Sequence, residues 1–217
     1  MSENLKVPKQ DNKHRAQLVA KGVLGAIPIA GGAVAETFDM IYQSGYEKRL
    51  NTWREEVSNR LIKISKSISI EELSQNEEFQ SLLTESTIVA LKNHQKVKLD
   101  AVLNLLINST ESPLEYDFKK LFLNYLDQFT SYHLRTLGVV FENEKLFKTD
   151  NYQYAHDLHE LIKKEVFHGD EELKGIVLEE LEPIKGLIKH EKNRIKDQTT
   201  SSLVLTNHGK RFIELVL

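Results

Sequence analysis

Apolar residues recur at helical spacing along most of the chain. From Glu36 to about Ile68 the pattern predicts one long helix, broken or bent near Ser44-Gly45. The apolar positions after that point are Tyr46, Leu50, Trp53, Val57, Leu61, Ile64 and Ile68, which follow one another every three or four residues. A stripe this narrow is typical of a helix that packs against one or two neighbours. We expect a seam inside the chain's own bundle, although a partner helix would also fit.

Four more helices are predicted between residues 70 and 140. They cover Ile70 to Asn93, Lys96 to Asn108, a segment that Ser112 caps with Pro113 as its first residue, and a shorter segment capped by Thr130 or Ser131. The expected buried face of the third is Leu114, Phe118, Leu121, Phe122, Tyr125, Leu126 and Phe129, and that of the fourth is Leu134, Leu137 and Val140. The loops are short, as neighbours in an antiparallel helical bundle require.

The C-terminal third has a different pattern. Helices are predicted from Tyr152 to Phe167 and from Asp170 to about Glu182, followed by β-like runs at residues 186–190 and 202–206 and a last helix capped by Thr206. The order helix, helix, β-ribbon, helix is that of a winged helix. An alternative keeps residues 171–196 as one helix kinked at Pro183.

The predicted fold is therefore mainly α: a helical bundle with a long N-terminal helix and a small winged-helix-like C-terminal module. We expect three parts, namely a flexible basic arm at residues 1–21, a bundle with a Gly-rich apolar entry segment at residues 22–148, and the winged-helix-like module at residues 149–217. The arm has five basic residues against two acidic ones.

Composition excludes several classes of protein and of site, but it does not identify a function. The 217 residues include 29 Lys and Arg against 32 Asp and Glu, a net charge of −3, which is not the basic balance of a typical nucleic-acid binder. The chain has no cysteine, which excludes disulfide scaffolds, thiolate zinc sites and cysteine nucleophiles. With 40% hydrophobic and 28% charged residues it is typical of a soluble, helix-rich protein, and we expect it in the cytoplasm.

The segment from Gly22 to Ala35 is uncharged and apolar, with Pro28 near its middle. As a straight helix it would extend about 21 Å, short of a ~30 Å hydrocarbon core, so it is not a transmembrane helix as it stands. We expect its side chains to be covered within the protein or by a second copy. The candidate interaction residues are Ile27, Ile29, Gly31, Gly32, Val34 and, on the long helix, Trp53. An alternative is that this segment, with the basic arm, acts peripherally on the inner membrane.

No pattern of catalytic residues stands out. His156, His159 and Glu160 share a helix face, but a metal site needs a further ligand and the spacing is not that of a zinc protease. The pair Gly31-Gly32 lacks the Lys and Ser or Thr of a phosphate-binding loop, and there is no Gly-x-Ser-x-Gly nucleophile elbow. We expect surface histidines, no catalytic residues, no bound metal, no cofactor and no enzymatic activity.

The winged-helix pattern raises the question of DNA binding. The helix predicted from Asp170 to Glu182 carries six acidic residues and one basic residue, so phosphates would repel it. The polar stretch after it is basic, and its candidates for weak, non-specific nucleic-acid contact are Lys189, Lys192, Arg194 and Lys196. A protein partner or a homo-oligomer is the expected use of the module, and a transcriptional regulator is a third interpretation.

Several segments resemble a group of bacterial helical proteins similar to the abortive-infection alpha (Abi-alpha) family. The matching stretches are residues 27–36, the Trp-containing helix 47–54, residues 98–108, 122–127 with 133–137, and 205–212. The resemblance implies an α-helical core with a small C-terminal module and a role in defence against phage; it brings no catalytic residues. The expected function is that of a non-enzymatic defence component acting through protein–protein contacts, with a membrane-acting effector as the alternative.

Overall fold

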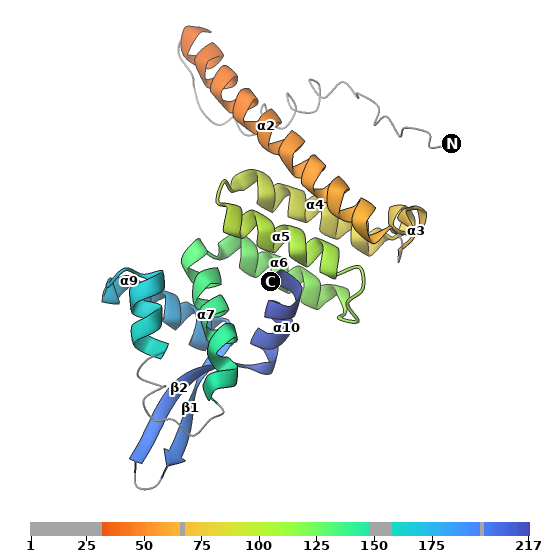
Figure 1. Ribbon diagram of the computed structural model, residues 1–217. Coiled ribbons are helices and arrows are strands. Elements are labelled where there is room, and N and C mark those ends of the chain that lie inside the picture. The colour runs from red at the N-terminus through yellow and green to blue at the C-terminus, as the bar shows by residue number, and fades with distance from the viewer. Residues whose placement is uncertain (1–31, 66–67, 148–157, 196–197) are drawn as a thin grey trace. The chain divides into compact units, whose positions relative to one another are not determined.

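A long helix, α2 (Gly32–Ile64), begins the described part of the chain (Figure 1). The computed structural model describes residues 32–65, 68–147, 158–195 and 198–217. Helix α2 continues through Ser44 and Gly45, so a break there is a wrong prediction. The Ser44 hydroxyl donates to the Ile41 carbonyl inside the helix, and one glycine costs only about 1 kcal/mol of helix propensity.

The chain divides into two compact units, residues 1–51 and residues 52–217. Within the second unit, the apolar stripe of α2 packs against the core: Trp53 and Val57 are buried, and Leu61 and Ile64 are partly buried. The indole Nε1 of Trp53 donates a 3.0 Å hydrogen bond to Oγ1 of Thr87. From residue 53 onward the stripe is therefore a seam within the chain.

The next two helices replace one predicted helix. Helices α3 (Ile70–Gln75) and α4 (Glu77–Lys92) are separated at Asn76, whose side-chain oxygen accepts a 2.9 Å hydrogen bond from the Phe79 amide. Asparagine is a strong N-cap, so it begins a new helix where apolar spacing alone predicts continuity. Helix α5 (Lys96–Asn108) has the predicted bounds.

Helix α6 (Tyr116–Gln128) begins later than predicted, with Glu115 as its N-cap. The Ser112 hydroxyl accepts from the Leu114 amide in the preceding turn, so Ser112 is not the cap of α6. Of its expected buried face, Leu121 is 36% exposed, whereas Leu123, which the apolar spacing did not include, is buried. Helix α7 (Ser131–Phe147) follows after Thr130 and buries Leu134, Leu137 and Val140 as predicted.

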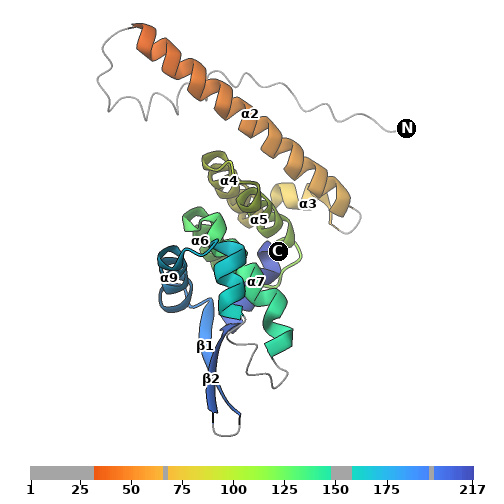
Figure 2. The same cartoon turned by 60° about the vertical axis from the view of Figure 1, so that its left-hand side comes forward.

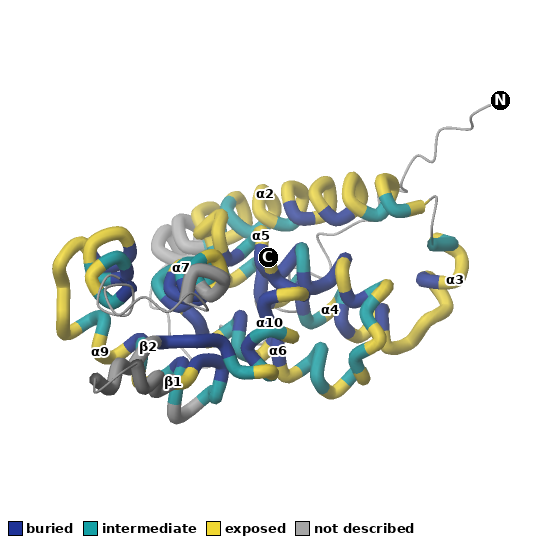
Figure 3. Tube along the Cα trace, turned by 60° about the horizontal axis from the view of Figure 1, so that its bottom comes forward, coloured by how far each residue is buried: buried dark blue, intermediate teal, exposed yellow. Residues whose placement is uncertain are grey.

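Helices α4, α5 and α6 contact one another, and α5 also contacts α7 and α10 (Asn207–Val216). Helix α5 is buried along most of its length, whereas α9 (Glu171–Glu179) is largely exposed (Figure 3). Phe212 of α10 makes edge contacts with Phe122 and Phe129, at ring-centroid distances of 5.3 and 5.8 Å. The C-terminal helix is thus part of the core that α4 to α7 build.

Two short π-helical turns flank α9: η1 (Ile162–Val166) and η2 (Glu180–Ile184). The amide of Lys185 bonds to the carbonyl of Glu180, five residues back, and Gly186 with a φ of 62° turns the chain out of the helix. Because Pro183 has no amide hydrogen to continue an α-helical ladder, the helix widens and ends there.

The strands β1 (Ile188–Ile195) and β2 (Gln198–Leu205) then form an antiparallel hairpin in which Ile188 pairs with Leu205. The predicted ribbon is confirmed, and the alternative of one kinked helix through residue 196 is wrong. In both Figure 1 and Figure 2 the far end of the hairpin extends beyond the helices of its unit. The predicted caps are also confirmed, because Asp170 accepts from the Leu173 amide and Thr206 from the Gly209 amide.

The fold is mainly α, with a long N-terminal helix and a small hairpin near the C-terminus. The expected boundary at residues 148–149 falls inside the unit 52–217, in a stretch outside the described residues. Of the helices described, none has the length and apolar character needed to cross a membrane.

Candidate functional site

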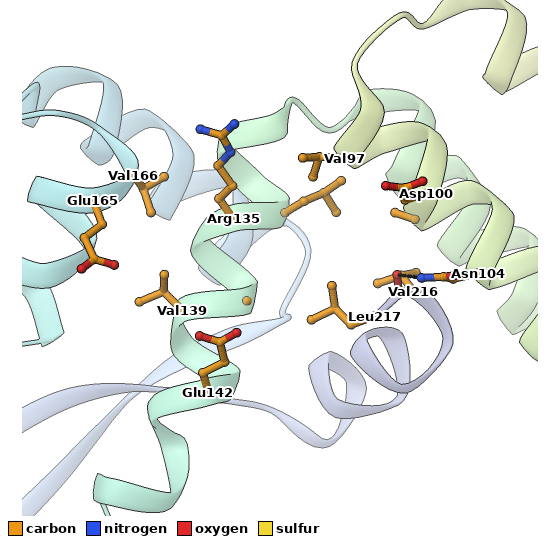
Figure 4. Close-up of a pocket in the computed structure, with 13 residues that line it drawn as sticks. Val97, Asp100, Asn104, Arg135, Val139, Glu142, Glu165, Val166, Val216 and Leu217 are labelled. Atoms are coloured by element: carbon orange, nitrogen blue, oxygen red, sulfur yellow. Dashed lines mark hydrogen bonds between the residues drawn. The ribbon is translucent and has the colours of Figure 1, made fainter.

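A groove of about 530 Å³ lies over the middle of α7 (Figure 4). Helix α7 forms its floor, the first half of α5 and the end of α10 form one wall, and η1 forms the other. Its lining residues are Val97, Asp100, Ala101, Asn104, Leu134, Arg135, Gly138, Val139, Glu142, Glu165, Val166, Val216 and Leu217. Four segments far apart in sequence therefore meet at one surface.

Partly exposed apolar side chains gather in this groove. Val97 is 37% exposed and Leu217 is 58% exposed, and both line the groove beside the buried Leu134. Figure 4 shows Leu217 and Val97 on one side of α7, with Val139 and Val166 on the other. Single exposed apolar residues are ordinary, but a set converging on one concave surface is typical of a binding site.

Gly138 lies in the floor of the groove, in the interior of α7. A helix-interior glycine costs about 1 kcal/mol relative to alanine, and one use of such a glycine is to allow a close approach to the backbone. A Cβ at this position would have no heavy atom within 4 Å, so no described part of the chain makes that approach. The glycine leaves open space in the floor, at the place where a bound segment would pack on α7.

The rim of the groove is acidic. Asp100 from α5, Glu142 from α7 and Glu165 from η1 are all exposed, and Arg135 of α7 is the one basic residue among the lining residues. None of these three carboxylates forms an ion pair with a side chain that the structure describes. Arg135 lies two helical turns before Glu142, and Figure 4 shows its guanidinium extending away from that carboxylate. Among the described lining residues, the rim therefore has three acidic side chains against one basic side chain.

The polar side chain deepest in the wall is already used within the fold. The amide Nδ2 of Asn104 donates a 3.2 Å hydrogen bond to the Val216 carbonyl, and Asn108 makes the equivalent bond to Leu215 at 3.1 Å. These two bonds hold the last turn of α10 against α5 and so fix that wall. Among the residues the structure describes, no group of three His, Asp or Glu side chains is placed to hold a metal ion.

The opposite wall is formed by the π-helical turn η1. Turns of this kind are rare, and within helices they occur frequently at functional sites because they displace side chains from the regular α-helical positions. Here the turn carries Glu165 and Val166, a charged and an apolar residue that both line the groove.

A second polar cluster lies at the start of α7, and its geometry has a structural explanation. His133 is buried and stacked on Phe129, its Nδ1 accepts from the Thr130 amide at 3.2 Å, and its Nε2 lies 3.0 Å from a carboxylate oxygen of Glu180. Burial lowers the pKa of His133 below its ordinary value and outweighs the opposing effect of Glu180. A neutral imidazole can accept the Thr130 amide at Nδ1 and donate to Glu180 from Nε2. The cluster therefore joins the start of α7 to η2.

Lys98 has a similar explanation. Its side chain is buried, and its Nζ donates a 3.3 Å hydrogen bond to the Asp127 carbonyl at the end of α6. Burial lowers the pKa of this ammonium group, and the negative end of the α6 dipole favours its charge. We therefore assign Lys98 to helix capping.

Few of the residues expected from sequence to mediate interactions are described. Ile27, Ile29 and Gly31 lie outside the described residues, and Gly32 and Val34 lie in the first turn of α2, where no side-chain surroundings are described. Trp53 lies in the core. Of the basic residues, Lys189 is exposed in β1, Lys192 and Arg194 lie further along β1, and Lys196 is outside the described residues.

The histidine pair expected at the protein surface is partly described. His159 stacks on His190 of β1 at a centroid distance of 5.8 Å, and His156 lies outside the described residues.

The groove itself was not predicted from sequence. Its one local signal is Gly138, a glycine inside an otherwise regular helical pattern, which marks a position where side-chain bulk is absent. Comparison with models of known protein families, with curated proteins and with solved structures finds no match to this chain.

Proposed function

We propose that this chain is a non-enzymatic protein that acts through protein–protein contacts, and that the groove over Gly138 is its binding surface. The observation that carries the proposal is the open space above Gly138, flanked by the exposed Val97 and Leu217. An apolar centre with a charged rim is the usual composition of a protein interface. The setting we propose is phage defence, which is what the resemblance to the Abi-alpha family implies.

We also propose that residues 149–217, of which the structure describes 158–195 and 198–217, are a winged-helix-like module used for protein contacts. In its support, a helical segment, α9, the β1–β2 hairpin and α10 follow one another in that order. The acidic character of α9 argues against DNA recognition by that helix. Its basic residue Lys174 is held by Glu171 at 2.6 Å, which leaves no free cation on α9 for a phosphate.

The experiment that tests this function adds a side chain at Gly138, in the floor of the groove. Gly138→Leu places a side chain in open space, and Gly175→Leu is the matched control, because Gly175 is also inside a helix with no heavy atom within 4 Å of a Cβ. Bacteria carrying the chain with its genomic neighbours are infected with a panel of phages, and plaques are counted. We expect the wild type and Gly175→Leu to protect, and Gly138→Leu to lose protection while its melting temperature stays within a few degrees of wild type.

Two results would contradict the proposal. Full protection by a folded Gly138→Leu variant would show that the groove is not needed, and absence of protection by the wild type against every phage would remove the defence role. Membrane potential is followed in the same cultures. A collapse of the potential that Ile29→Asp abolishes, with folding unchanged, would favour the membrane-acting effector.

A further inference from the structure

We infer that the occupant of the groove over Gly138 is a basic amphipathic helix supplied by a partner protein. This inference rests on the proposed function and specifies the chemistry of the partner. It is carried by three properties of the lining: side chains that are apolar at the centre, carboxylates at the rim, and the absence of a side chain on Gly138.

The lining favours a helix over an extended peptide. The groove is formed by α5, α7, η1 and α10, whose backbone groups bond within their own helices, so the lining offers no row of free amides and carbonyls for a strand to pair with. An extended segment entering this apolar surface would leave its own backbone unpaired, at a cost of several kcal/mol per group. A helix brings its backbone hydrogen bonds with it.

Gly138 favours the same occupant. Helices pack at axis distances of about 8–10 Å, and the shortest distances require small residues at the point of contact. Because a Cβ at position 138 would meet nothing within 4 Å, a second helix can approach α7 there without displacing any described residue. Apolar residues one turn apart on that helix would cover Val97 and Leu217 on one side and Val139 and Val166 on the other.

The rim determines the charge of the partner. Asp100, Glu142 and Glu165 come from three different elements, so they surround the apolar centre on several sides, and Arg135 opposes them only at one end of the groove. Lys and Arg beside the apolar stripe of a bound helix would reach these carboxylates with their charged ends while their methylene stems cover apolar surface. Exposed pairs contribute little each, so the rim chiefly selects the partner's charge and speeds association.

The test uses the full chain and three synthetic helical peptides that share one apolar face of leucine and alanine. Their flanking positions are all lysine, all glutamine or all glutamate, and binding is measured by fluorescence anisotropy at low and high salt. We expect the lysine peptide to bind at least about tenfold more tightly than the glutamate peptide at about 20 mM salt. The difference should shrink severalfold near 0.5 M salt, because the rim is solvent-exposed.

Two variants assign the binding to the groove. Gly138→Leu should weaken the lysine peptide at least about tenfold, and the control Gly175→Leu should leave it unchanged. The double variant Glu142→Lys/Glu165→Lys, which alters only exposed side chains, should reverse the order so that the glutamate peptide binds more tightly.

Several outcomes would overturn the inference. Equal affinities for the three peptides, or no measurable binding of any of them, would show that the occupant is not a basic helix; protection against phage that still depended on Gly138 would then leave the proposed function standing. A wild-type dimer that becomes a monomer in Gly138→Leu would assign the groove to a second copy of this chain. Peptide binding that follows the predicted order without any phage protection would keep the inference and remove the defence role.

Discussion

The carbonyl oxygen of Leu187 occupies the position that a side chain at Gly209 would take: a Cβ at residue 209 would lie 2.0 Å from that oxygen. Gly209 is in the first turn of α10, and Leu187 directly precedes β1. Thr206 joins the two, since its amide donates to the Leu187 carbonyl at 3.0 Å and its hydroxyl caps the Gly209 amide at 2.9 Å. This contact fixes where the last helix leaves the hairpin, and so where α10 meets α5.

Gly209→Ala is expected to destabilise the protein by about 3 kcal/mol, because the backbone of Leu187 must move to admit the methyl group. The control is Gly138→Ala, in another helix, where the methyl group meets nothing within 4 Å and higher helix propensity should stabilise the protein by up to about 1 kcal/mol. Chemical denaturation followed by circular dichroism measures both. Equal stability of the two variants would contradict the packing of α10 on Leu187.

Trp53 and Thr87 give a second prediction. Trp53→Ala should lower the free energy of unfolding by about 3–5 kcal/mol, because it removes a buried indole from the core. Thr87→Val should cost about 1–3 kcal/mol, since the indole amine would lose its acceptor, and Thr87→Ser, which keeps the hydroxyl, should cost less. If Trp53→Ala melts like the wild type, α2 does not pack on the core as described.

The pH dependence of stability should include a contribution from His133. Its pKa is lowered by burial, so the unfolded chain binds a proton more readily than the folded one, and stability falls as the pH decreases below about 6.5. Protonated Nδ1 also cannot accept from the Thr130 amide. The groups that face this ring are Glu180, which opposes the loss, and Lys98 and Lys185, which increase it.

His133→Gln should reduce this pH dependence between about pH 7 and 5, measured as the midpoint of urea unfolding at several pH values. His208→Gln provides a comparison, because burial and Arg211 also lower the pKa of His208. If the pH dependence of stability is unchanged in His133→Gln and abolished in His208→Gln, it belongs to His208 and the prediction for His133 is wrong.

Nucleic-acid contact by the hairpin should be weak, independent of sequence and steeply reduced by salt. The candidates are Lys189, Lys192, Arg194 and Lys196, and such contacts would be made to phosphates alone. Replacing all four with glutamine should abolish any mobility shift of duplex DNA without affecting folding. Protection of one specific DNA sequence at physiological salt would favour the transcriptional-regulator interpretation.

Local rules predicted much of the secondary structure. Asp170 and Thr206 begin helices as their side chains suggest, because an N-cap acts on amides only two or three residues away. The same kind of local interaction also explains two errors, since Asn76 interrupts a helix that apolar spacing predicts as continuous, and Ser112 bonds in a turn instead of capping α6.

The groove is formed by contacts between distant segments, which local sequence patterns do not predict. Val97, Gly138 and Glu165 belong to three elements and Leu217 follows α10, and each is unremarkable in its own segment. Their meeting depends on long-range contacts such as Asn104 with Val216, which are 112 residues apart. The sequence pattern identified the apolar stripe that includes Trp53, but this stripe packs inside the chain. The groove is formed only by the tertiary arrangement of the helices.

The most direct test of the binding groove measures the reactivity of a thiol at position 138. The chain has no cysteine, so Gly138→Cys and its control Gly175→Cys each carry a single thiol, and at both positions a Cβ has no heavy atom within 4 Å. The rate of modification by a small maleimide is measured with and without a saturating amount of the lysine peptide. We predict that the peptide slows the reaction at position 138 at least about tenfold and leaves position 175 unchanged. Bound peptide with an undiminished rate at position 138 would contradict the account.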